Sequence, residues 1–178
     1  MQVKMIFNLL KKPLVLTLAL LGYGCFPLPA QRGEFTQQEF ESMSEEMSSK
    51  KVENILPDDV RSSFVLLDTR EKKEYTVSHL DKARYAGYDH INMDALIKDL
   101  DKSDTIVVYC SVGYRSGKIG EKLQKAGFKN VYNLKGGLFR WANEDRKLVN
   151  QEGETTEKVH GFDKNWSKWL KKEVEAVF

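Results

Sequence analysis

Short apolar runs alternate with helical patterns from Val52 onward. Runs of β-branched and aromatic residues without polar alternation are typical of strands that are buried on both faces. They occur at 64–67, 105–109 and 131–134, with weaker examples at 52–55 and 83–85. Helical patterns lie between them, at 71–77, 93–100 and 115–126. This alternation predicts an α/β domain of three layers, with helices on both faces of a central parallel sheet of about five strands.

The first thirty residues follow a different pattern. Lysines precede a short apolar run over 14–21, small residues follow it, and no acidic residue occurs before Glu34. This is the layout of a secretory signal, and the run is shorter than the roughly 20 residues of a membrane span. We therefore expect a signal peptide over 1–24 and a location in the periplasm or cell envelope.

Cys25 follows Gly24 and resembles the lipidated cysteine of a bacterial lipoprotein signal, which would anchor the mature chain to a membrane. Gly22 stands where such signals usually carry leucine. Cleavage after Ala30 and an uncleaved anchor are therefore open alternatives.

The rest of the chain divides into three parts. Residues 25–50 are rich in Gln, Glu, Ser and Met and are expected to be a linker. Residues 51–148 carry the alternating pattern of the domain. Residues 149–178 form a tail with apolar side chains at near-helical spacing, which predicts an amphipathic helix that docks on the domain or contacts a membrane or partner. These side chains are Trp166, Trp169, Leu170 and Val174.

Composition narrows the function classes. The 178 residues include 28 Lys+Arg and 26 Asp+Glu, and the net charge of +2 provides no basic field for nucleic acid. Two cysteines and three scattered histidines form neither a disulfide framework nor a metal site. We expect a monomer without metal, cofactor or nucleic-acid partner.

The segment Cys110-Ser-Val-Gly-Tyr-Arg-Ser116 joins a predicted buried strand to a predicted helix. Ligands of parallel sheets bind beyond the carboxyl ends of the strands, where Cys110 falls. Loop amides, the helix N-terminus and the Arg115 guanidinium would all favour a thiolate. Gly113 allows a tight turn. The pattern predicts a nucleophilic cysteine, although a small buried hydrophobic residue is the simpler alternative. The expected anion-binding residues are Ser111, Val112, Gly113, Tyr114, Arg115 and Ser116.

This loop resembles the active-site loop of rhodanese-like sulfurtransferases. Asp68-Thr-Arg70 resembles the Asp-x-Arg that ends an earlier strand in that family. Asn133-Leu-Lys-Gly-Gly137 followed by Trp141 resembles the family's Gly-Gly-x-x-x-Trp element. The order and spacing of the three motifs agree, and the resemblance covers roughly residues 51–148. The segment 78–83 lacks both glycines of the family's Gly-His-Ile-x-Gly-Ala motif, which leaves the choice of substrate open.

The resemblance implies a two-step sulfur transfer. Cys110 would take sulfur from a small anionic donor such as thiosulfate, become a persulfide, and pass the sulfur to cyanide or a thiol. Arg115 would attract the donor. Asp68 and Arg70 would support the site by pairing with each other or by holding loops.

Two other readings stay open. One is a non-catalytic rhodanese-fold module that carries sulfur or binds a partner. The other is a phosphatase or arsenate reductase, but related phosphatases have one more loop residue than the four between Cys110 and Arg115, which favours sulfur transfer. Of the histidines, His79 is expected to be structural and His90 and His160 to be solvated.

Overall fold

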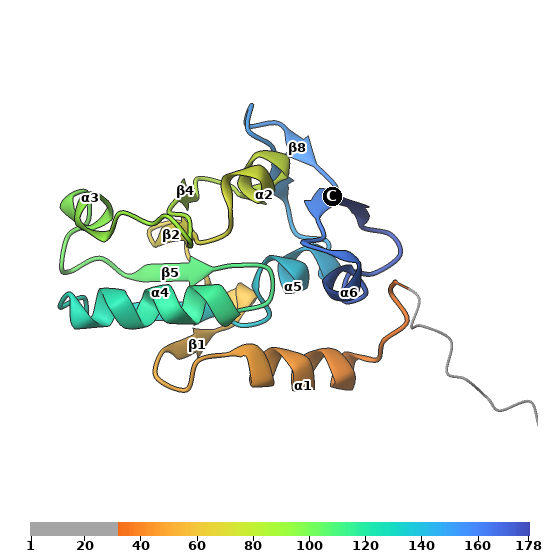
Figure 1. Ribbon diagram of the computed structural model, residues 1–178, viewed down its shortest axis with the longest axis horizontal. Coiled ribbons are helices and arrows are strands. Elements are labelled where there is room, and N and C mark those ends of the chain that lie inside the picture. The colour runs from red at the N-terminus through yellow and green to blue at the C-terminus, as the bar shows by residue number, and fades with distance from the viewer. Residues whose placement is uncertain (1–31) are drawn as a thin grey trace, which may run out of the picture.

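A computed structural model describes residues 32–178 of the protein, so the expected signal at 1–24 and Cys25 lie outside the described residues. The main sheet has five parallel strands in the order β1-β6-β5-β2-β4, as the sequence pattern predicts (Figure 1). The strands are β1 (Glu53–Ile55), β2 (Val65–Asp68), β4 (Arg84–Tyr85), β5 (Ile106–Tyr109) and β6 (Val131–Leu134).

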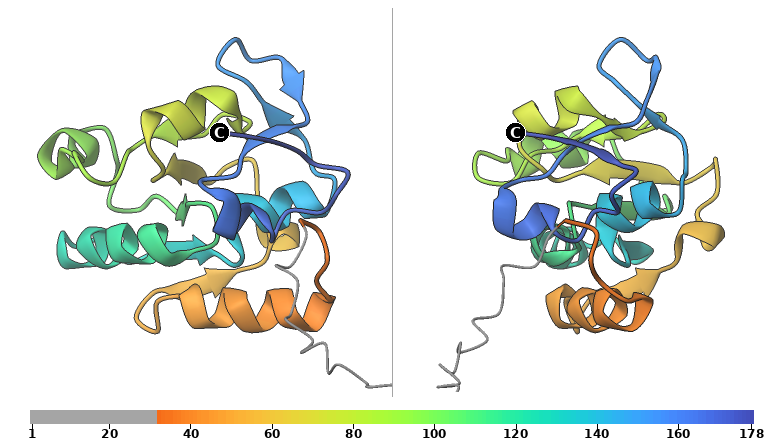
Figure 2. Two further views of the ribbon diagram at one scale, coloured as in Figure 1. Left: turned by 45° about the vertical axis from the view of Figure 1, so that its right-hand side comes forward. Right: turned by 90° about the vertical axis from the view of Figure 1, so that its right-hand side faces the viewer.

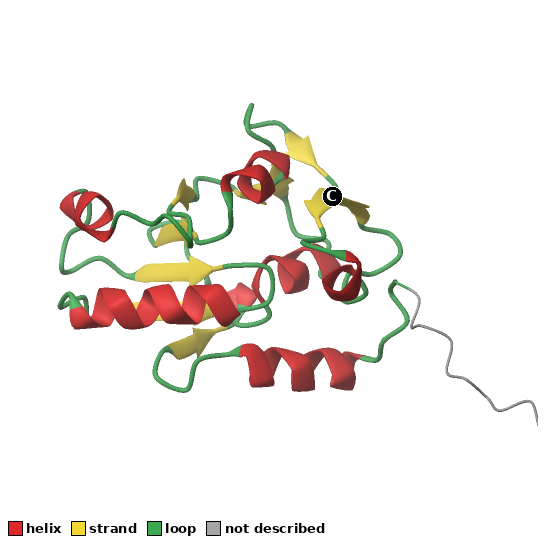
Figure 3. Cartoon of the chain, in the orientation of Figure 1, coloured by secondary structure: helices red, strands yellow, loops and turns green. Residues whose placement is uncertain are grey.

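Helices flank these strands, as the red and yellow elements of Figure 3 show. Three were expected from the sequence and correspond to α2, α3 and α4. The helices are α1 (Gln37–Met47), α2 (Lys72–Val77), α3 (Met93–Lys98), α4 (Tyr114–Lys125), α5 (Gly137–Asn143) and α6 (Lys164–Ser167), with a 3₁₀ turn η1 (Pro57–Asp59). Within the described chain, no helix is both long and apolar enough to cross a membrane.

The central strand β5 separates two hydrophobic cores. All four of its residues are buried, which confirms that it is covered on both faces. Ile106 and Val108 pack in one core with Leu123 of α4, whereas Val107 and Tyr109 pack in the other. Because successive side chains of a strand point to opposite faces, this alternation places a helical layer on each side of the sheet. The three-layer α/β/α architecture is therefore confirmed.

Helix α1 differs from the expected linker. Thr36 caps it and forms a capping box with Glu39. Phe40 and Met43 are buried in the same core as α5, and the Phe40 ring lies 6.2 Å from that of Trp169. A polar composition hid these two anchors, because only one face of the helix is apolar. The prediction of a linker is therefore wrong for residues 37–47.

The C-terminal residues also differ from the expectation. Instead of one amphipathic helix, they form β9 (Lys158–His160) paired with β10 (Glu175–Val177) and the four-residue α6. Figure 2 shows this segment beside α5. Its apolar side chains Val159, Leu170 and Val174 are buried in the core, so the tail is part of the domain. Tertiary pairing has overridden a weak helical pattern.

A small antiparallel sheet completes the fold. It pairs β3 (His79–Leu80) with β7 (Leu148–Val149) and β7 with β8 (Thr155–Thr156). The segment after α5 is thereby fixed to the chain just beyond α2, and β9 packs against α2.

Candidate active site

The ends of three adjacent strands bring the sequence motifs together. Cys110 directly follows β5, and Asp68 ends β2, where it lies opposite Tyr109 in the register. Asn133 of β6 lies opposite Val108 on the other side of β5. Because all these strands are parallel, their carboxyl ends form one edge of the sheet, and the loop after β5 lies in its middle.

Cys110 lies at the base of a cavity with a volume of about 400 Å³. The residue is 1% exposed, and its Sγ accepts a hydrogen bond of 3.2 Å from the Gly113 amide. Gly113 has a φ of 112°, a left-handed conformation that a residue with a Cβ atom adopts only under strain. Within the described chain, no other amide of residues 111–116 is hydrogen-bonded to Sγ, so the expected ring of donors is reduced to one.

Asn133 holds the loop in this shape. Its side-chain amide donates to the Gly113 carbonyl at 3.0 Å, and its Oδ1 accepts a bond of 2.7 Å from the Ser116 hydroxyl. Asn133 and Ser116 are fully buried. Ser116, which we expected to contact substrate, therefore supports the loop from below instead.

The start of α5 closes the loop from the other side. The Leu138 amide donates to the Cys110 carbonyl at 2.8 Å, and the Phe139 amide donates to the Ser111 carbonyl at 2.9 Å. Gly137 lies so close that a Cβ atom there would be 2.4 Å from the Cys110 carbonyl oxygen. Gly137, the first residue of α5, is therefore required by this close approach of two backbones, whereas a Cβ atom on Gly136 would meet the side chains of Arg140 and Phe40.

Arg115 makes a two-pronged ion pair with Glu74 of α2. Its Nη1 and Nη2 each donate to one carboxylate oxygen at 2.7 Å, and Nη2 also reaches the Ser111 hydroxyl at 3.2 Å. The Glu74 side chain is fully buried, and that of Arg115 is 14% exposed. Burial opposes the charge of Arg115, but the bonds to Glu74 and the proximity of Cys110 prevail and raise its pKa. Burial likewise opposes the charge of Glu74, but Arg115 lowers its pKa below the ordinary 4.5.

Glu74 is a functional residue that the sequence analysis missed. Its position three residues after Glu71 completes a capping box, a pattern that usually lies on a helix surface. The available signal was Arg115 itself, because an arginine next to a buried strand needs a carboxylate partner.

Apolar side chains from both ends of the described chain form the walls of the cavity. Met47 comes from α1, whereas Phe162 and Trp166 come from the C-terminal segment. Tyr114, 52% exposed, lines it as well, and the base consists of Cys110 and its loop. The sequence analysis placed neither Phe162 nor Trp166 here, because both are more than 45 residues away from the loop in sequence.

The sequence profile of the rhodanese-like domain matches residues 43–144, more than half of the chain. The chain belongs to the rhodanese-like domain family. This confirms the resemblance that the three motifs indicated.

Relatives of this rhodanese-like protein have different activities. The chain is 36% identical over 98 residues to a tRNA uridine(34) hydroxylase of Sodalis glossinidius, a match that covers 53% of this chain and 27% of the relative. It is 32% identical over 81 residues to a probable adenylyltransferase/sulfurtransferase, MoeZ, of Mycobacterium tuberculosis, which covers 46% and 21% of the two chains. These matches span about a quarter or less of the relatives' own length.

A solved structure supports the fold. The thiosulfate sulfurtransferase of Pseudomonas aeruginosa superimposes with a TM-score of 0.52 at 19% identity, over 65% of this chain and 23% of that one. The rhodanese-like architecture therefore persists at low sequence identity.

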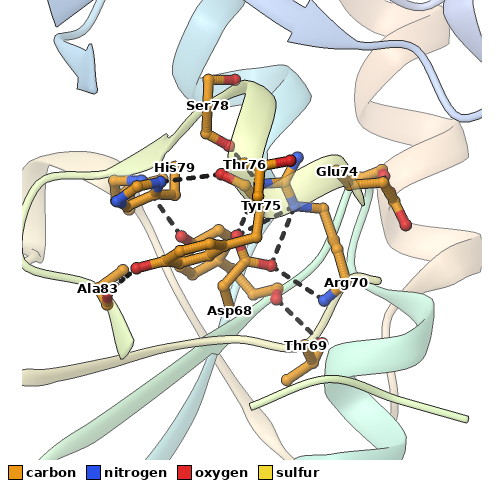
Figure 4. Close-up of polar contacts among 12 residues, drawn as sticks. Asp68, Thr69, Arg70, Glu74, Tyr75, Thr76, Ser78, His79 and Ala83 are labelled. Atoms are coloured by element: carbon orange, nitrogen blue, oxygen red, sulfur yellow. Dashed lines mark hydrogen bonds and ion pairs between the residues drawn. The ribbon is translucent and has the colours of Figure 1, made fainter. Parts of the chain in front are cut away.

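Figure 4 shows the Asp68–Arg70 pair of the rhodanese-like domain with its polar contacts. Arg70 Nη2 contacts Asp68 Oδ2 at 2.6 Å and donates to the Ser78 carbonyl at 2.6 Å. Both charged side chains are fully buried, and neither lines the cavity. Burial opposes the charge of Arg70, but Asp68 outweighs it and raises the pKa of Arg70. The expected pairing is observed, and it ties β2 to the segment after α2.

The histidines separate into two cases. His79 stacks on Tyr75 with ring centroids 3.8 Å apart, which agrees with a structural role. His160, expected to be solvated, is 3% exposed, because β9 packs into the domain. Its Nδ1 accepts a hydrogen bond of 3.1 Å from the Phe162 amide. Among the described residues, no group of His, Cys, Asp and Glu side chains has the arrangement of a metal site.

Proposed function

We propose that this protein is a sulfurtransferase that carries sulfur as a persulfide on Cys110. The observation that supports this most strongly is the position of Cys110, which lines a cavity while one backbone amide donates to its Sγ. Arg115 and the start of α4 add positive potential on the same side, and such surroundings stabilise a thiolate. The sulfurtransferase among the relatives agrees with this chemistry.

The loading step uses a small anionic donor such as thiosulfate. The Cys110 thiolate attacks the outer sulfur of the donor, and a new S–S bond forms. The old S–S bond breaks, and its electron pair leaves with sulfite. No proton, oxidant or reductant is consumed, and covalent catalysis thereby divides the transfer into two steps. The Gly113 amide and Arg115 stabilise the negative charge on the sulfur.

The second step passes the outer sulfur to cyanide or a thiol. Glu74 neutralises much of the Arg115 charge, so the sulfite that is released in the loading step is held weakly and can leave. The four-residue spacing between Cys110 and Arg115 gives a tighter loop than that of related phosphatases, which favours a persulfide over a phosphate ester.

Intact-mass measurement tests this proposal. The purified protein is treated with thiosulfate or polysulfide, and we expect a gain of one sulfur atom that cyanide removes as thiocyanate. Cys110→Ser should gain none, because a hydroxyl group is not ionised near neutral pH. Cys25→Ser is the matched control and should behave as the unchanged protein does. Sulfur uptake by Cys110→Ser, or aryl phosphate hydrolysis without any uptake, would contradict the proposal.

We also propose that the protein acts outside the cytoplasm. The positive start and short apolar run before Gly24 support export, and Cys25 supports lipidation. Mass spectrometry of the mature N-terminus tests both points: a diacylated Cys25 supports an anchor, a start at Gln31 supports ordinary cleavage, and an intact Met1 contradicts export.

A further inference from the structure

The cavity above Cys110 is larger and less polar than a small anion requires. Its volume of about 400 Å³ lies in the range of about 300–1,000 Å³ that is typical of pockets for whole organic ligands. Met47, Val112, Phe162 and Trp166 contribute apolar side chains to its lining. In the described part of the chain, Ser111, Tyr114 and Arg115 supply its polar groups besides the sulfur of Cys110.

The charge at the base is already compensated. Among residues 32–178, Arg115 is the one charged residue that lines the cavity, and both of its Nη atoms are bonded to Glu74 at 2.7 Å. A second anionic group on a substrate would therefore find no free cation along these walls. An uncharged apolar group would instead find side chains to pack against, and burying it is favourable.

Phe162 is held over the cavity by specific contacts. It is 44% exposed and has a φ of 64°, which is a genuine outlier for a bulky side chain. The bond from its amide to His160 Nδ1 fixes this conformation, and its ring lies 5.1 Å from the Arg115 guanidinium. Backbone strain of this kind persists where the surrounding structure enforces it and is concentrated at ligand sites.

Trp166 is positioned just as firmly. Asp163 accepts hydrogen bonds from the Asn165 and Trp166 amides at the start of α6, at 2.7 and 2.9 Å. Phe162 and Trp166 both lie beyond residues 43–144, the part that matches the family profile. The aromatic part of the wall therefore lies outside the segment that matches the family, whereas Met47 and Val112 lie within it.

Building on the persulfide chemistry proposed above, we propose that the sulfur acceptor is a thiol carried on an aromatic or branched apolar body. The acceptor thiolate attacks the outer sulfur of the Cys110 persulfide and forms a new S–S bond. The bond between the two enzyme sulfurs breaks, and its electron pair returns to Sγ as a thiolate. The loaded persulfide takes up one proton from water before the attack, and this proton stays on the transferred sulfur, so no oxidant or reductant is needed.

Two acceptors with the same alkyl thiol group test this assignment. The full protein is loaded with polysulfide, freed of excess donor and mixed with 2-phenylethanethiol or 2-mercaptoethanol. Loss of the persulfide is followed by intact mass, and the new hydropersulfide is trapped by alkylation. We expect the second-order rate constant to be at least about tenfold higher for the aromatic thiol, the discrimination that a modest apolar difference provides in a fitted pocket.

Matched variants test whether Phe162 causes the preference for the aromatic thiol. Phe162→Asn removes the ring but suits the left-handed backbone, and it should reduce the ratio of the two rate constants at least about threefold, as the loss of roughly one buried methylene would. Leu56→Asn is the control, because Leu56 is equally exposed at 43% and lies outside the cavity. The ratio of the two rate constants should be unchanged in this control. A measurement that needs no variant is inhibition by 2-phenylethanol, which should compete with the aromatic thiol.

The outcomes separate the two proposals. A persulfide that forms and passes to both thiols at equal rates, without competition by 2-phenylethanol, overturns the apolar acceptor and leaves sulfur transfer intact. Failure to form any persulfide on Cys110 overturns both. An unchanged ratio in a folded Phe162→Asn protein also overturns the assignment of the wall.

Discussion

The ion pair between Glu74 and Arg115 gives the sharpest prediction. Glu74→Gln keeps the size and one acceptor oxygen of the side chain but removes its charge. Breaking a buried pair costs about 3–5 kcal/mol. Because Arg115 is 14% exposed and keeps one bond to the amide oxygen, we expect a loss somewhat below that range, about 2–3 kcal/mol. For a protein of this size, that lowers the Tm by about 5–10 °C.

Urea titration measures this loss as a lower midpoint with an unchanged slope. Glu175→Gln is the matched control, because Glu175 pairs with Lys158 at 3.8 Å while both side chains are more than half exposed. A midpoint shift for Glu74→Gln no larger than that of Glu175→Gln would refute the reasoning.

Glu74→Gln should also change the KM for the donor and the pH dependence of stability. Loss of Glu74 frees the Arg115 charge, so the KM for thiosulfate should fall while the stability falls. Because the pKa of Glu74 lies below its ordinary 4.5, the pair stabilises the protein above that pH, and this stabilisation is lost as the pH falls through the lowered value. In Glu74→Gln, this part of the acid-induced loss of stability should be absent.

Three further predictions test other features. Phe40→Ala should lower the free energy of unfolding by about 3–5 kcal/mol in urea titrations, because the ring is 2% exposed. If residues 37–47 were a linker, the substitution would leave this free energy almost unchanged. Gly137→Ala should destabilise more than Gly153→Ala, since both glycines have positive φ but only the first Cβ meets a backbone atom, and equal urea midpoints would contradict this. Burial lowers the pKa of His160 below 6.5, so the stability of the protein should decline as the pH falls below that value. The decline should be smaller in His160→Gln, and equal pH profiles of the urea midpoint for the two proteins would contradict this prediction.

The strands and the nucleophile loop were predictable because their signals are local. The runs that became β2, β5 and β6 are short, unbroken and apolar, and Cys110 follows one of them directly. The order and direction of the five strands then follow from strand–helix alternation. The family motifs added Asp68, Arg70 and the paired glycines, which the structure brings to the same edge of the sheet.

The missed features depend on contacts between distant segments. Glu74 resembles a helix-capping residue until α2 is placed against the loop. Phe40 lies in a polar segment, and its burial depends on Trp169, which is 129 residues away by number. The C-terminal pattern has helical spacing, but β9 and β10 pair with each other, and their residues Val159 and Val177 are of a type that favours strands. No local pattern distinguishes these outcomes.

The split origin of the site has a consequence for biosynthesis. Every residue that shapes the nucleophile loop, from Glu74 to Phe139, precedes residue 144, whereas Phe162 and Trp166 come later. A chain emerging from the ribosome therefore exposes the residues of the nucleophile loop before those of the aromatic wall. Proteolytic trimming of the last twenty residues would remove that wall, and it would also remove Val159, Leu170 and Val174 from the core, so the sulfur cannot be uncovered without a loss of stability.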